Sequence, residues 1–210
     1  MILASGAELR LMNPGGARTV ICVNGGQGKE VPGTWSATLE YLVRSLAPRF
    51  PGLAFAEVRY RIKSWQVLDL CIEDCRAAIA ATEGPVMLVG FSMGGAVAIS
   101  AADDPRVDGV IGLAPWIPDR LDVAPIAGKS LNVLHGSLDR WLPGIPGVSA
   151  TLSRRGFERA LALGAEGSYT LIRGGVHGLA LRSPQGRLVP LPRASAWTRL
   201  IADQLGSFAG

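Results

Sequence analysis

Cysteine is scarce in this sequence, and its scarcity excludes whole classes of protein. Only three cysteines occur among 210 residues, at Cys22, Cys71 and Cys75, too few for the disulfide framework of a small secreted domain. Cys71 and Cys75 lie four residues apart on one face of a predicted helix, but no cysteine or histidine nearby completes a set of metal ligands. We therefore expect three small buried side chains and no metal site.

Long apolar stretches are also missing. No stretch approaches the roughly 20 consecutive apolar residues that a bilayer-spanning helix needs. Residues 1–6 lack both the basic region and the long apolar region of a secretory signal. We therefore expect no membrane span and a cytoplasmic location.

Charge of one sign does not accumulate anywhere along the chain. The 21 lysines and arginines, 18 of them arginine, stand against 17 aspartates and glutamates and give a formal net charge of +4. No run of five or more basic residues occurs, and aromatic residues are not interleaved with basic clusters. We therefore expect no nucleic-acid partner.

The sequence does contain a regular alternation of short apolar runs and longer amphipathic segments. The expected strands cover residues 8–12, 19–23, 53–60, 86–89, 107–113, 131–135 and 169–172. The expected helices cover residues 34–50, 68–81, 148–163 and 195–208, with a further helix directly after residue 94. We predict an α/β fold, a doubly wound and mostly parallel sheet with helices on both faces, in one domain spanning residues 1–210. Residues 182–193, which include three prolines, are expected to form an irregular surface loop.

The most informative motif is Gly90-Phe91-Ser92-Met93-Gly94, which follows an apolar run and precedes a run of small residues. A G-x-S-x-G pattern between a strand and a helix is typical of a nucleophile elbow. The sharp turn exposes and orients the serine hydroxyl, and the glycines leave space where side chains would collide with the strand and the helix. We therefore predict that Ser92 is a nucleophile.

A serine nucleophile needs a histidine base and a carboxylate that orients the base, in the chain order serine, acid, histidine. His177 follows the last predicted strand between glycines, so we predict it as the base. The other histidine, His135, ends a strand and is expected to shape the loop of the acid. Asp139 is the preferred acid because it follows the strand that His135 ends, whereas Asp119 and Asp122 follow the preceding strand and are the alternatives.

A glycine-rich turn, Asn24-Gly25-Gly26-Gln27-Gly28, follows the second predicted strand. We predict an oxyanion hole made by the N–H group of Met93, which begins a helix, together with that of Gly26 or, as second choice, Gln27. A phosphate-binding loop is excluded, because valine stands where that motif needs its first glycine and Glu30 stands where it needs a hydroxyl residue.

With the glycine-rich turn, the G-x-S-x-G motif, Asp139 and His177 in this order, the chain resembles the α/β-hydrolase superfamily over nearly its whole length. The resemblance implies a serine hydrolase that cleaves an ester or thioester through Ser92, His177 and Asp139, by way of an acyl-enzyme and without a metal or cofactor. Asn24 stands where many relatives carry histidine, which leaves the second oxyanion donor open. Residues 114–130 are too few for a cap domain, so the chain resembles small capless esterases and thioesterases. It also resembles dienelactone-hydrolase-like proteins, although those use cysteine as the nucleophile.

The same motifs leave other activities open. Lactonases, amidases and acyltransferases use the same three side chains. A binding or scaffold protein with the hydrolase fold and no catalysis is the alternative from another class. The sequence does not indicate the oligomeric state.

Apolar residues near the expected site predict an acyl pocket for a small-molecule ester or thioester. Those expected to bind substrate are Trp35, Trp116, Trp141 and Leu179, with Val31, Met93, Ile117 and Leu142 as further candidates. Arg59, Arg61 and Lys63 follow a strand on the same side of the sheet. They either hold an anionic substrate group or form a solvated charged loop, and the loop is the expected outcome.

Overall fold

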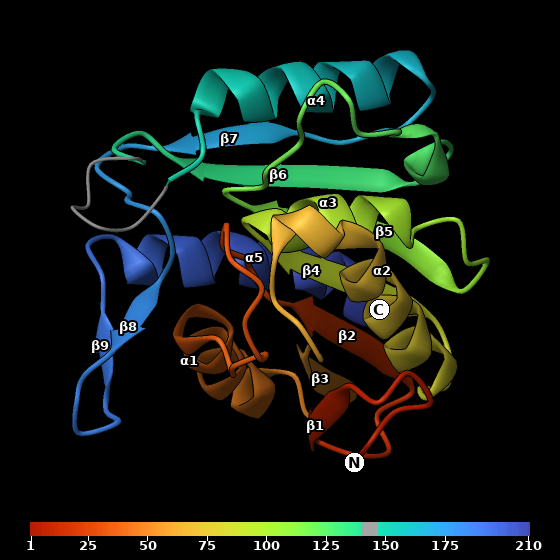
Figure 1. The fold of residues 1–210 in the computed structure, drawn as a ribbon, viewed down its shortest axis with the longest axis vertical. Coiled ribbons are helices and arrows are strands. Elements are labelled where there is room, and N and C mark those ends of the chain that lie inside the picture. Colours follow the sequence, from red (N-terminus) through yellow and green to blue (C-terminus); the bar gives the residue numbers. More distant parts are fainter. Residues whose placement is uncertain (140–146) are drawn as a thin grey trace.

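The computed structural model describes residues 1–139 and 147–210, and a seven-stranded sheet lies at its centre (Figure 1). The strands follow the spatial order β1-β3-β2-β4-β5-β6-β7. β1 is antiparallel to β3, and the other five neighbouring pairs are parallel. The strands are β1 (Glu8–Met12), β2 (Arg18–Val23), β3 (Leu53–Arg59), β4 (Val86–Phe91), β5 (Val107–Leu113), β6 (Ser130–Gly136) and β7 (Tyr169–Ile172).

Helices cover both faces of the sheet (Figure 1). One face packs against α1 (Ala37–Leu46) and α5 (Ala194–Ala209). The other face packs against α2 (Leu68–Ala80), α3 (Met93–Ser100) and α4 (Ala150–Ala162). Within the part of the chain that the structure describes, no helix is both long enough and apolar enough to cross a membrane.

Alternation along the central strands sends side chains to both helical layers. On β2, Ile21 and Val23 belong to the core under α2 and α3, whereas Val20 and Cys22 belong to the core under α1 and α5. Such two-sided burial is characteristic of parallel strands in a doubly wound sheet. The predicted fold class is therefore confirmed.

The predicted helix over residues 34–50 is too long at both ends. α1 begins after Ser36, whose Oγ accepts a hydrogen bond from the N–H of Leu39 at 3.3 Å and thereby caps the first turn. Thr34 points its hydroxyl elsewhere, to Lys63. At the other end Pro48 lacks the N–H that an α-helix requires, and residues Ala47–Arg49 form a 3₁₀ turn. Two more 3₁₀ turns are Trp65–Val67 and Ala124–Ile126.

The predicted irregular loop over residues 182–193 is also wrong in part. Strands β8 (Ala180–Arg182) and β9 (Leu188–Pro190) pair with each other in an antiparallel hairpin. Figure 1 shows this hairpin beside α1 and apart from the main sheet. Pro190 is tolerated because it lies at the end of a two-stranded ribbon, where no further strand needs its missing N–H.

All three cysteines are buried. Cys71 and Cys75 lie on α2 and face the core, and Cys22 lies within β2. Burial raises the pKa of each thiol, that of Cys71 to about 11 and that of Cys75 to about 12. The thiols therefore stay protonated and pack as small apolar groups.

Candidate active site

Ser92 occupies the sharp turn between β4 and α3. Its backbone has φ 54° and ψ −120°, a conformation that residues with a Cβ rarely adopt. The end of β5 and the residues after it hold this turn, because the N–H of Ser92 donates to the carbonyl of Leu113 at 2.9 Å and its carbonyl accepts from Trp116 at 2.8 Å. The strained conformation is thus fixed by backbone hydrogen bonds on both sides of the serine.

Gly94 is required by the close approach of this turn to β2. A Cβ atom at position 94 would overlap the carbonyl oxygens of Val23 and Asn24. Only glycine allows α3 to begin directly against the end of β2. The G-x-S-x-G spacing predicted this packing.

His177 and Asp139 are joined by a hydrogen bond. His177 Nδ1 lies 2.8 Å from Asp139 Oδ2, although the two residues are far apart in the sequence. The other carboxylate oxygen, Oδ1, accepts from the N–H of Val148 at 3.0 Å. The ring of His177 also packs against that of Phe91, with centroids 5.0 Å apart. Both members of the pair are buried, with side-chain exposures of 5% and 2%.

His135 supports the same carboxylate oxygen of Asp139. Its side chain is fully buried, and its Nε2 lies 3.2 Å from Asp139 Oδ2 and 3.1 Å from the carbonyl oxygen of Val148. Because both neighbours of Nε2 are acceptors, this nitrogen must carry a proton. His135 therefore donates to Asp139, as expected from its position at the end of β6.

The two histidines change the acidity of Asp139. Burial alone raises the pKa of its carboxyl group, but hydrogen bonds from His135 and His177 outweigh burial and lower that pKa from 3.8 to about 2. The carboxylate therefore stays charged at neutral pH. A charged Asp139 keeps the proton of His177 on Nδ1 and leaves Nε2 free to accept one.

The glycine-rich turn after β2 is held by Asn24. The Asn24 side chain accepts from the N–H of Gly25 at 2.7 Å and donates to the carbonyl of Thr34 at 2.8 Å. The N–H of Gly25 is therefore already used. The next residue, Gly26, packs so closely on Met93 that a Cβ at position 26 would overlap the Met93 sulfur. Gly26 and the first residue of α3 thus lie side by side, as an oxyanion hole requires.

A cavity of about 240 Å³ opens between this turn and α1. Ser92 and His177 both line it, together with Gly26 from the glycine-rich turn. Trp35 and Lys63 contribute side chains to the opposite wall. The structure therefore brings the predicted nucleophile and the predicted base to one cavity.

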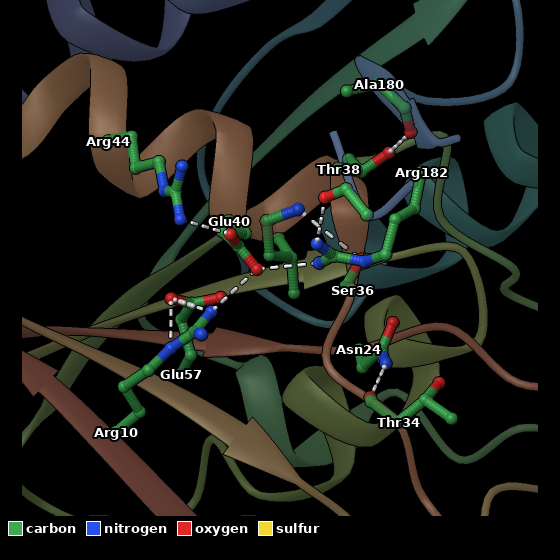
Figure 2. Close-up of polar contacts among 12 residues, drawn as sticks. Arg10, Asn24, Thr34, Ser36, Thr38, Glu40, Arg44, Glu57, Ala180 and Arg182 are labelled. Atoms are coloured by element: carbon green, nitrogen blue, oxygen red, sulfur yellow. Dashed lines mark hydrogen bonds and ion pairs between the residues drawn. The ribbon is translucent and has the colours of Figure 1, made fainter. Parts of the chain in front are cut away.

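The hairpin β8–β9 closes one side of this cavity through Ala180 and Leu181. Thr38 of α1 donates its hydroxyl to the carbonyl of Ala180 at 3.3 Å. Arg182 reaches Glu40 of α1 at 2.7 Å (Figure 2). The hairpin is thus fastened to α1 by one neutral and one charged hydrogen bond.

Glu40 is the centre of a buried charge network (Figure 2). Arg10 and Arg44 also contact its carboxylate, and Arg10 bridges it to the buried Glu57. Burial raises the pKa of Glu40, but its arginine partners outweigh burial and the pKa falls below its ordinary value. Burial raises the pKa of Glu57 above its ordinary value. The network balances two buried carboxylates with three arginines, Arg10, Arg44 and Arg182.

A second cavity, of about 230 Å³, also borders Ser92. It shares Gly26 and Ser92 with the first cavity but is lined by the rings of Trp65 and Trp116 and by Met93. Arg120 lies at its border, with the guanidinium 5.7 Å from the centre of the Trp116 ring. The two cavities therefore meet at the serine.

The predicted substrate-binding residues fall into three groups. Trp35 lines the first cavity and Trp116 the second. Leu179 and Ile117 are fully buried core residues and line neither cavity. Trp141 and Leu142 lie outside the described residues. The alternative acids are engaged elsewhere, since Asp119 pairs with Arg155 and Asp122 caps the turn at Ala124.

The three basic residues after β3 have different surroundings. Arg59 forms an ion pair with Glu8. Arg61 contacts both Glu73 and Asp74 of α2, at 2.6 and 2.7 Å. Lys63 donates to the hydroxyl of Thr34 at 2.8 Å and lines the first cavity. Of the three, Lys63 is the one that lines a cavity together with Ser92.

Several residues at the site escaped the sequence analysis. Thr38, in the first turn of α1, lines the first cavity, and Trp65, which begins the 3₁₀ turn before α2, lines the second. Both residues are distant from Ser92 in the sequence. No spacing rule reveals them, because tertiary packing brings them to the site. The hydrogen bonds by which Asn24 holds the glycine-rich turn could have been predicted, since the side chain of an asparagine directly after a strand often bonds to the nearby backbone in a turn.

Comparison with known proteins indicates the family of this chain. Residues 20–206 match the alpha/beta hydrolase family. No curated protein matches the chain in sequence.

Solved structures of similar fold include an alpha-beta serine hydrolase homologue from Coxiella burnetii, with a TM-score of 0.65, 17% identity, and coverage of 95% of this chain and 91% of that one. An esterase from Pyrobaculum calidifontis has a TM-score of 0.70 and 14% identity, over 99% of this chain and 83% of its own. A serine hydrolase without a lid from Xanthomonas campestris has a TM-score of 0.58 and 18% identity, over 84% of this chain and 83% of its own.

The match to the family extends over most of the chain and includes Ser92, Asp139 and His177. The fold, with its parallel sheet wound on both faces, is the one that these solved structures share. The chain belongs to the alpha/beta hydrolase family.

Proposed function

We propose that this protein is a serine hydrolase that cleaves a carboxylic ester or thioester, with Ser92 as nucleophile, His177 as base and Asp139 as the residue that orients the base. The observation that carries the proposal is the meeting of two features in one cavity. Ser92 is held there in a strained turn, and His177, which is hydrogen-bonded to Asp139, borders the same space. A nucleophile, a base and an orienting group are the three parts of a serine triad.

The first half of the reaction follows from the proton positions. With its Nδ1 proton donated to Asp139, His177 has a free lone pair on Nε2. His177 takes the proton of the Ser92 hydroxyl as Oγ attacks the carbonyl carbon. The carbonyl oxygen gains negative charge, which the N–H groups of Met93 and Gly26 stabilise, with Gln27 as the alternative second donor.

Met93 is suited to this role because it is the first residue of α3. The N–H groups of the first helical turn have no partner within the helix, and the helix dipole favours negative charge there. When the intermediate collapses, His177 returns the proton to the leaving alcohol or thiol, and the acyl group remains on Ser92. Water then attacks the acyl-enzyme with His177 again as base, which releases the acid.

Hydrolysis of para-nitrophenyl esters of graded acyl length, with matching thioesters, tests this proposal. We expect turnover by the wild type and none above background by Ser92→Ala. Ser207→Ala is the matched control, because Ser207 is exposed on α5, far from the cavity, and should leave the rate unchanged. Lactones, amides and acyl acceptors belong in the same panel. Turnover that survives Ser92→Ala would contradict the proposal, and a folded wild type that cleaves no member would point to a binding protein.

A further inference from the structure

Among the residues that the structure describes, Lys63 differs from the other basic residues of its segment in having no acidic partner. Arg59 pairs with Glu8, and Arg61 pairs with two carboxylates of α2. Over residues 1–139 and 147–210, Lys63 forms no ion pair, and its ammonium group donates to the Thr34 hydroxyl. An ammonium group has three donors, so two remain for another acceptor.

The cavity that Lys63 lines is suited to an anion. Among the described residues that border it, none is acidic, and Lys63 is the only lysine or arginine. Hydroxyl groups of Thr34 and Ser36 lie on the same wall and can donate further hydrogen bonds. The Lys63 side chain is half-buried, and burial lowers the pKa of its ammonium group. A bound anion would offset the free-energy cost of burying the charged ammonium group.

The position of His177 indicates which part of a substrate enters this cavity. His177 lines the Lys63 cavity and not the cavity of Trp65 and Trp116. In the proposed reaction His177 delivers a proton to the leaving group, so the leaving group must lie on the His177 side of Ser92. The cavity of Trp65 and Trp116, which His177 does not line, is then left for the acyl group.

We propose that the Lys63 cavity binds the leaving group of the substrate, and that Lys63 recognises a carboxylate or phosphate on that leaving group. The inference rests on the proposed serine hydrolase function and adds the substrate class, an ester or thioester of an anionic alcohol or thiol. The cavity volume of about 240 Å³ lies just below the range of about 300–1,000 Å³ for drug-sized ligands, so the leaving group is small.

The test uses pairs of esters that differ in one charge. Meta-carboxyphenyl butyrate and its neutral methyl ester place the charge on the leaving group, and meta-phosphonophenyl butyrate distinguishes phosphate-like from carboxylate recognition. Para-nitrophenyl hydrogen glutarate carries the charge on the acyl side, and para-nitrophenyl butyrate is its neutral match. The readout is kcat/KM for each ester in the wild type, Lys63→Gln, Lys63→Arg and Lys29→Gln. Lys29 is the matched control, because it is exposed and lines neither cavity.

We expect the wild type to prefer an anionic leaving group over the neutral match, and Lys63→Gln to lower that preference by about tenfold or more, as loss of a charge-assisted hydrogen bond predicts. Lys63→Arg should restore part of the preference, and Lys29→Gln should change nothing. The circular dichroism spectrum and the thermal unfolding of Lys63→Gln should match those of the wild type, which shows that the variant is folded. High salt should weaken the preference in the wild type.

Three results would overturn the inference. Equal rates on the charged and neutral leaving groups, or a preference that Lys63→Gln retains, would remove Lys63 from recognition. A Lys63-dependent preference for the glutarate ester would place the anion on the acyl side instead. If the wild type cleaves no ester, charged or neutral, the proposed function fails first and this inference fails with it.

Discussion

Ser92 and Lys63 border the same cavity but are held in position by different parts of the structure. Ser92 is fixed by its own backbone, through hydrogen bonds to the end of β5 and the contact of Gly94 with the end of β2. The backbone N–H of Lys63 donates to the carbonyl of Val31 in another surface segment, and its ammonium group is positioned by a hydrogen bond to the exposed Thr34. The reacting residues thus depend on the sheet, and the cavity wall depends on side chains from separate surface segments.

The same contrast holds between the other reacting residues and the rest of the cavity wall. Asp139 and His177 are nearly fully buried and belong to one hydrogen-bonded cluster with His135. The hairpin β8–β9 belongs to the wall, and the half-exposed Arg182 fastens it to α1. Substitutions of the reacting residues should abolish the reaction, whereas substitutions in the cavity wall should change which substrates bind. Three predictions test this division, and a fourth tests the core beneath it.

The largest effect is expected from the nucleophile and the base. Ser92→Ala and His177→Ala should each lower kcat by at least about 10³-fold, because neither group acts without the other. The double variant should be no slower than the slower single variant. Steady-state kinetics on one ester measure all three, and losses that multiply in the double variant would mean that the two residues do not act as one unit.

Asp139→Asn should lower kcat by about 10²- to 10⁴-fold, because an amide N–H would face Nδ1 of His177 and force the wrong tautomer. The same change should alter stability with pH. The pKa of Asp139 is about 2 in the folded protein against an ordinary value of 3.8, so the unfolded chain takes up the proton first as pH falls.

Asp139 therefore stabilises the fold fully above about pH 4, and this contribution is lost as pH falls toward 2. Urea unfolding at neutral pH and at pH values between these limits measures it. The difference in the free energy of unfolding between wild type and Asp139→Asn should shrink on acidification. A constant difference would show that Asp139 is not held charged by its histidine partners.

The reacting residues are the part of the site that the sequence predicts best. The elbow, the Ser-Asp-His order and the glycine-rich turn depend on local rules for strand ends, so they are visible in short motifs. Their spatial meeting follows from the parallel sheet, because the carboxyl ends of its strands share one edge. Asp139 was preferred over Asp119 because it follows the strand that His135 ends and not the preceding one, and the structure pairs Asp139 with His177.

The residues that form the walls of the two cavities are less predictable from the sequence. The hairpin over residues 180–190 consists of two three-residue strands that pair only with each other among the described strands, so neither carries a periodic signal of its own. The start of α1 was missed because Thr34 and Ser36 are both good capping residues, and contacts from Lys63 and Asn24 to residue 34 decide between them. Cavity residues such as Trp65 are set by tertiary packing.

A moderate effect is expected where the hairpin meets α1. Arg182→Met should raise KM for esters that fill the Lys63 cavity a few-fold and cost about 1 kcal/mol or less in stability, because Glu40 keeps Arg10 and Arg44. Arg187→Met is the matched control in the turn of the same hairpin. Kinetics and thermal unfolding of both variants provide the measurement, and equal KM values would separate the hairpin from substrate binding.

The smallest effect is expected from the cysteines. Burial raises the pKa of all three thiols, so a thiol-alkylating reagent at neutral pH should neither modify the native protein nor inhibit it. The same reagent should modify all three after unfolding in urea. Mass spectrometry counts the adducts, and rapid modification of the native protein would show that the core around α2 opens.

Labelling with a fluorophosphonate probe tests the central claim most directly, because it reports an activated serine without requiring the natural substrate. The purified wild type, Ser92→Ala and His177→Ala are treated with the probe, and the modified residue is mapped by mass spectrometry. The account predicts one adduct on Ser92 in the wild type and none in either variant. A folded wild type that stays unlabelled, or an adduct that persists in His177→Ala at the wild-type rate, would contradict it.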